Sequence, residues 1–243
     1  MMDPIIPLLA AILFAAAFLQ SATGFGMALV CTALIPLLLP VKEAIAFVSI
    51  ACFIATIFIM LLNRSGLSFR HAGPLALGML LGIPIGYYGL KSVDGTLVVR
   101  ILGITLMLIA LAEFLQSRYE GKRKLPEKSA GIFGLIGGVI TGAFNVGGPP
   151  VVIYAYSRPW SKTETVAILQ SVFLTGSITR NALMWQAGEF TKDLLFLVLC
   201  SIPTALIGIW LGKKTLDRLP QVWLRRTVFG LIFVIGLKYV IEA

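Results

Sequence analysis

The chain has 243 residues, of which 58% are hydrophobic and only 13% are charged, and its formal net charge is +9. Its mean hydropathy is +0.94, whereas soluble globular domains are roughly 45–50% apolar and about 25% charged. This composition excludes an ordinary soluble enzyme. The lysines and arginines lie in short connections between apolar runs, without a basic stripe or an aromatic stacking platform, which argues against nucleic-acid binding.

Long apolar runs follow one another along the chain. Five of them contain no charged residue, at 4–41, 44–63, 72–90, 129–157 and 194–212, and two carry charge only towards their ends, at 97–117 and 222–240. A membrane-spanning helix needs about 20 mostly apolar residues, so these runs predict spans. A further helix with polar positions is expected at 163–185. The fold class is therefore an all-α polytopic membrane protein.

The order of these parts predicts two related halves. A first repeat at 1–116 and a second at 130–243 flank a basic linker at 117–129. Each repeat has a long uncharged stretch with a glycine-rich break, then a helix with polar positions, a span containing Ile-Pro and a span beginning near arginine. Alignment of Gly26 with Gly148 gives an offset of 122 residues. We interpret each repeat as a broken or re-entrant helix pair followed by three transmembrane helices.

The distribution of basic residues predicts that the two repeats are inverted. If each broken stretch counts as two arms and the central linker is cytoplasmic, fourteen loop Lys and Arg residues lie inside and four outside. If each stretch counts as one continuous span, the repeats are parallel and the same eighteen residues divide nine and nine. Only the inverted arrangement obeys the positive-inside rule.

The two breaks are the candidate substrate site. Gln20, Ser21 and Thr23 precede or enter the first break and Asn145 lies in the second, and all four are uncharged hydrogen-bond donors. Glycines let backbone approach a ligand closely; the breaks hold Gly24, Phe25 and Gly26 in the first and Gly147 and Gly148 in the second. A helix N-terminus carries about half a positive charge, so two such ends can bracket an anion at the membrane midplane. The alternative is that these glycines only permit close helix packing.

The helix expected at 163–185 supplies three further candidates. Gln170 and Asn181 share one helical face with Ser177, and Arg180 lies next to that face. An arginine inside an apolar helix is by default a functional candidate, as a substrate contact or a gate. Because it lies about one and a half turns from the expected outer end, snorkelling to the surface is the alternative.

The residues of both breaks resemble the TauE/SafE family of sulfite-exporter-like permeases. The resemblance rests on Gln20-Ser21-Ala22-Thr23-Gly24-Phe25-Gly26 and on Gly147-Gly148-Pro149-Pro150 after a basic central loop, and it extends from about Pro4 to Val240. It implies a sulfur-containing anion as substrate: sulfite, thiosulfate, sulfoacetate or another organosulfonate. Met27-Ala28 and Pro149 depart from the usual pattern.

The expected function is a secondary transporter for such an anion in a bacterial-type inner membrane, with an anion channel as the alternative. The expected partners are a small anionic substrate and the lipid bilayer. No intramembrane-enzyme motif, metal-ligand spacing or cofactor motif is present in the sequence. The direction of transport, the coupling ion and the choice between a monomer and a homodimer stay open.

Overall fold

The computed structural model of the chain describes residues 5–62, 69–91, 93–116, 125–215 and 221–242, so most of the basic linker lies outside the described residues. Within them the fold is all-helical, as predicted. The elements are α1 (Ile5–Thr23), α2 (Met27–Leu34), the 3-10 turn η1 (Ile35–Leu37), α3 (Val41–Leu62), α4 (Phe69–Lys91), α5 (Gly95–Gln116), the 3-10 turn η3 (Glu127–Ser129), α6 (Ala130–Phe144), α7 (Gly148–Tyr156), α8 (Lys162–Gln186), α9 (Lys192–Thr215) and α10 (Gln221–Glu242).

Four helices among the described residues are long and apolar enough to cross a membrane: α3, α4, α5 and α9. Large apolar side chains on their outer faces are exposed, for example Leu108 at 62% and Leu199 at 70%. Such a surface is stable only in contact with lipid or another apolar partner. α8 is as long as these helices but carries buried polar side chains, including Gln170 and Arg180, so its position inside the bundle accounts for its lower hydropathy.

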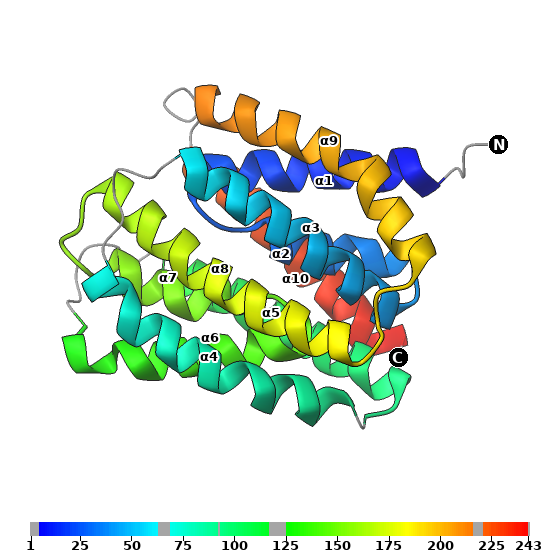
Figure 1. Cartoon of the computed structure of the whole chain (residues 1–243), viewed down its shortest axis with the longest axis horizontal. Helices are drawn as coiled ribbons and strands as arrows, with labels where there is room; N and C mark the ends of the chain where they lie inside the picture. Colours follow the sequence, from blue (N-terminus) through cyan, green and yellow to red (C-terminus); the bar gives the residue numbers. More distant parts are fainter. Residues whose placement is uncertain (1–4, 63–68, 92, 117–124, 216–220, 243) are drawn as a thin grey trace.

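The helices pack in matched pairs (Figure 1). α1 lies along α9 on one flank, α4 lies along α6 on the opposite flank, and α3 and α8 pack together between the flanks, while α5 packs against α10. The buried apolar side chains form two clusters, one among α1, α2, α3 and α9 and the other mainly among α4 to α8 and α10. The core is therefore divided into two parts, and the first break with the start of α2 contributes to both, Phe25 to one and Met27 to the other.

Both breaks depend on left-handed backbone. α1 ends before Gly24 and Gly26, whose φ angles are 85° and 117°, and α6 ends at Asn145, whose φ is 63°. Glycine adopts this region without steric cost, and asparagine is among the few other residues that tolerate it. Helix resumes at Met27 and at Gly148.

Glycines allow the backbones of the flank helices to touch. They recur every fourth residue on the facing surfaces of α4 (Gly78, Gly82 and Gly86) and α6 (Gly134, Gly138 and Gly142), where an added Cβ would overlap a backbone carbonyl of the other helix. On the other flank, a Cβ on Gly208 of α9 would lie 2.5 Å from the carbonyl oxygen of Phe14 in α1. Small residues at this spacing are the usual means of close helix packing in membranes.

We predict that Gly82→Ala lowers the thermal stability of the purified protein, because the new methyl group has to displace the backbone of α6. Overpacking of this kind costs about 1–3 kcal/mol. Gly89 lies on the same helix, and a Cβ added there would meet no other atom within 4 Å. Gly89→Ala is therefore the matched control and gains up to about 1 kcal/mol of helix propensity. Equal melting temperatures of the two variants in one detergent would contradict the contact.

Candidate functional site

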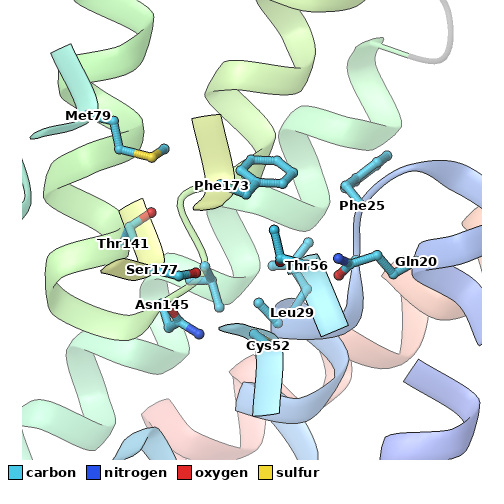
Figure 2. Close-up of a pocket in the computed structure, with 14 residues that line it drawn as sticks. Gln20, Phe25, Leu29, Cys52, Thr56, Met79, Thr141, Asn145, Phe173 and Ser177 are labelled. Carbon is cyan, nitrogen blue, oxygen red and sulfur yellow. The ribbon is translucent and has the colours of Figure 1, made fainter. Parts of the chain in front are cut away.

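A cavity of about 500 Å³, including the part that opens outward, lies between the two breaks (Figure 2). Its walls come from α1, α2, α3, α4, α6, α7 and α8 and from the residues of both breaks. Its enclosed space accommodates a few water-sized groups. The position agrees with the expectation that the breaks meet at one site.

The polar part of the lining is neutral. Five polar side chains line the cavity: Gln20, Thr56, Thr141, Asn145 and Ser177. Thr141, Asn145 and Ser177 gather on one side, and Gln20 and Thr56 lie on the other (Figure 2). The remaining walls are mainly apolar, with Phe25, Leu29, Met79, Val146 and Phe173. The cavity therefore offers hydrogen-bond donors on two sides without a formal charge in its lining.

The start of α2 faces the cavity. Its N-cap is Gly26, which has no side chain to cap the first turn, and Gly26, Ala28 and Leu29 all line the cavity. Gln20 accepts a hydrogen bond through Oε1 from the backbone N–H of Met27 at 3.2 Å. The first turn of a helix carries unpaired N–H groups and a partial positive charge. Gln20 thus fixes the end of α1 to the start of α2 and leaves that turn directed at the cavity.

The second break presents a different donor. α7 begins at Gly148, and Pro149 and Pro150 follow, so its first turn has few N–H groups to offer. Asn145 lines the cavity and is 7% exposed, and its Nδ2 atom has no hydrogen-bond partner among the described residues. A buried donor without a partner costs about 1–3 kcal/mol. The amide of Asn145 is therefore a donor that awaits an acceptor in the cavity.

Arg180 lies one layer behind the cavity. It is 2% exposed, and it donates from Nε to the carbonyl of Gly142 at 3.2 Å and from Nη2 to the carbonyl of Ala143 at 3.4 Å. Its side chain is buried on the C-terminus of α6 and does not snorkel to the surface. A cation at a helix C-terminus neutralises the negative end of the helix dipole.

The other sequence candidates make contacts outside the cavity lining. Gln170 donates from Nε2 to the carbonyl of Gly24 at 2.9 Å, and Asn181 donates from Nδ2 to the carbonyl of Ser49 at 3.4 Å. Ser21 donates from Oγ to a carbonyl of α9 at 2.7 Å, and Gly147 packs against the backbone of α6. The side chain of Thr23 lies outside the described part of the chain. Of the twelve candidates, Gln20, Phe25, Gly26, Asn145 and Gly148 line the cavity.

The sequence interpretation missed two polar lining residues, Thr56 and Thr141, whose counterparts in the other half, Ser177 and Gln20, also line the cavity. Thr141 follows Gln20 by 121 residues, and Ser177 follows Thr56 by the same interval. Cys52 and Phe173, which also line the cavity, are 121 residues apart as well. A shift of 121 residues forward from Gln20 leads to Thr141, and the same shift backward from Ser177 leads to Thr56. This interval would therefore have identified both threonines.

Comparison with known proteins agrees with this architecture. Residues 8–239 match the family described as Sulfite exporter TauE/SafE. The chain is 24% identical over 253 aligned positions to the "Probable sulfite/organosulfonate exporter TauE" of Cupriavidus necator (strain ATCC 17699), an alignment that covers 98% of this chain and 96% of the relative. No solved structure matches the chain. Because the family match extends over almost the whole sequence, the chain belongs to the TauE/SafE sulfite exporter family, a family of multi-pass membrane transporters and not of enzymes.

Proposed function

We propose that this protein is a secondary transporter that moves a small sulfur-containing anion, namely an organosulfonate, sulfite or thiosulfate, across the inner membrane. The observation that carries the proposal is the unpartnered, buried amide of Asn145 in a cavity that also receives the first turn of α2. Sulfur oxyanions present several acceptor oxygens, which neutral donors on two sides can satisfy together. The name of the Cupriavidus necator relative supports this substrate class.

Electrostatics favour an anion although the lining is neutral. The first turn of α2 directs positive partial charge at the cavity. At the second break, the negative end of α6 would oppose an anion, but Arg180 neutralises that end. In a membrane interior such interactions are screened much less than in water. The combined field of both breaks therefore attracts a small anion without a salt bridge to it.

We further propose that the halves are inverted repeats, with the binding site between them. Equivalent helices begin or end 121 residues apart: Thr23 corresponds to Phe144, Met27 to Gly148, and Val41 to Lys162. The register therefore differs by one from the alignment of Gly26 with Gly148. The packing of α1 on α9 matches that of α6 on α4, and α3–α8 and α5–α10 are pairs of equivalent helices. The charge distribution adds the opposite orientation and a cytoplasmic linker.

We predict that Asn145→Gly weakens anion binding, because glycine keeps the positive φ of this position and removes only the amide. A hydrogen bond to a charged group contributes about 1.5–3 kcal/mol, so the dissociation constant for sulfite or methanesulfonate should rise roughly ten- to hundredfold in calorimetry on the purified protein. Asn145→Asp, which replaces a donor by a carboxylate, should abolish binding.

Asn181→Ala is the matched control for Asn145, because this amide bonds to the carbonyl of Ser49 and does not line the cavity. It is expected to lower the melting temperature and to change the anion dissociation constant little. An Asn145→Gly protein that is folded and binds both anions as tightly as the natural protein would overturn the site. Saturable counterflow in proteoliposomes supports a carrier, whereas single-channel currents would show the anion channel instead.

We predict that the positive charge of Arg180 is needed for binding beyond its effect on folding. Arg180→Gln leaves one or both of the carbonyls of Gly142 and Ala143 without a cation and should lower both the melting temperature and the anion affinity. Arg180→Lys keeps the charge and loses part of the hydrogen bonding, so it should retain most of the affinity despite reduced stability. Equal affinity of the two folded variants would show that the charge is unimportant.

We predict that equivalent positions of the two halves face opposite sides of the membrane. Lys42 and Thr163 are exposed, 121 residues apart, and near the start of equivalent helices. In a Cys52→Ala, Cys200→Ser background, Lys42→Cys should react with an impermeant maleimide in intact cells, and Thr163→Cys only after permeabilisation. Labelling of both from the outside would support parallel repeats and contradict inversion.

A further inference from the structure

A second, smaller cavity lies behind Phe25. It is small, with room for about one water-sized group, and all of its lining is apolar: besides Phe25, Gly26 and Leu29 it is formed by Leu19, Val228, Phe229 and Ile232. We call this space the annex. Phe25, Gly26 and Leu29 line the main cavity as well, so the two spaces are separated only by residues of the first break and the start of α2.

Phe25 is the partition between the two spaces. It lies in the break, outside both α1 and α2, and it is 3% exposed. Its ring centroid is 6.3 Å from that of Phe229 in the annex wall, with the ring planes tilted by 39°, and in Figure 2 it stands at the edge of the main cavity beside Gln20. The side chain of Phe25 therefore lines both spaces.

Most of the annex wall is buried, while Gly26 and Val228 are partly exposed. Leu19, Phe229 and Ile232 are 6%, 7% and 1% exposed, whereas Leu231 and Val234 on the same helix, α10, are 50% and 61% exposed. The membrane-facing surface of α10 is thus a different surface from the one that lines the annex. The annex adjoins the main cavity at Phe25, Gly26 and Leu29, which line both spaces.

We infer that the annex is a subsite for the apolar tail of the transported anion, and that Phe25 determines how long a tail is accepted. The inference rests on the proposed function, because the sulfonate group has to occupy the main cavity between Gln20 and Asn145 for its tail to reach Phe25. The favoured class of substrate is then a monoanionic sulfonate with a short, uncharged alkyl or aryl tail.

The chemistry of the lining explains this preference. The annex has no polar side chain, so an ammonium or carboxylate group on the tail would lose its hydration without gaining a partner, which is costly. A methylene group instead gains from burial, by an amount that corresponds to roughly fourfold in affinity for each group. Discrimination between tails therefore arises in the annex, while discrimination for the anionic head arises in the main cavity.

The first test is a ligand series on the purified natural protein. Dissociation constants for sulfite and for methane-, ethane-, propane- and butanesulfonate should fall roughly fourfold per methylene until the annex is full. 3-Aminopropanesulfonate should bind at least tenfold more weakly than propanesulfonate. Equal dissociation constants along the alkyl series, or equal binding of the amino compound, would overturn the inference.

Substitutions in the annex wall locate the effect. Phe229→Ala enlarges the annex, so the ratio of the affinity for butanesulfonate to that for methanesulfonate should increase about tenfold. Ile232→Phe fills the annex and should decrease this affinity ratio. Phe233→Ala is the matched control, because Phe233 lies on the same helix, is 38% exposed and lines neither cavity. An unchanged ratio in both folded annex variants would also overturn the inference.

These outcomes separate the inference from the proposed function. If neither sulfite nor methanesulfonate binds the natural protein, or if Asn145→Gly leaves their binding unchanged, the proposed function itself fails. If both anions bind in an Asn145-dependent manner while tail length has no effect, only the annex assignment fails.

Discussion

Every backbone N–H and C=O group at a helix break inside a membrane needs a partner from the protein, because the hydrocarbon phase supplies none. The end of α6 meets this requirement completely. The carbonyl of Thr141 accepts from the N–H of Asn145 at 2.8 Å, those of Gly142 and Ala143 accept from Arg180, and that of Phe144 accepts from Oγ1 of Thr32 at 3.3 Å. All four terminal carbonyls of this helix are thus paired, three of them by side chains.

The partners also connect the two halves of the chain. Thr32, from the first half, donates to the end of α6, and Gln170, from the second half, donates to the carbonyl of Gly24 in the first break. Each break is therefore completed by a residue of the other half. The same bonds leave the first turn of α2 and the amide of Asn145 directed at the shared cavity. Beside the cavity, the four terminal carbonyls of α6 are paired, whereas the amide nitrogen of Asn145 has no partner among the described residues.

The sequence predicted the helices well, since hydropathy and breaking residues determine them locally. The expected polar helix at 163–185 is α8 (Lys162–Gln186), and the run at 194–212 lies within α9 (Lys192–Thr215). Threonines of the cavity were harder to identify, because a threonine in an apolar helix commonly bonds its own backbone, as Thr105 does at 2.8 Å. Only tertiary packing decides whether such a side chain faces a cavity. The partner of Arg180 is likewise 38 residues away in sequence, on α6.

Packing constrains how the two halves of the chain can move relative to one another. The backbone of α6 touches that of α4 through glycines, and α9 touches α1 in the same way, so each broken helix is held to a long helix of the other half. A hinge within either flank would have to pull apart two helices whose backbones are in direct contact, with no room for a side chain between them. The interface of α3 with α8, by contrast, is made through side chains such as Asn181, and it borders the cavity through Thr56 and Ser177. A movement that leaves both flanks intact would occur across this interface, where it would change the distance between the polar side chains on the two sides of the cavity.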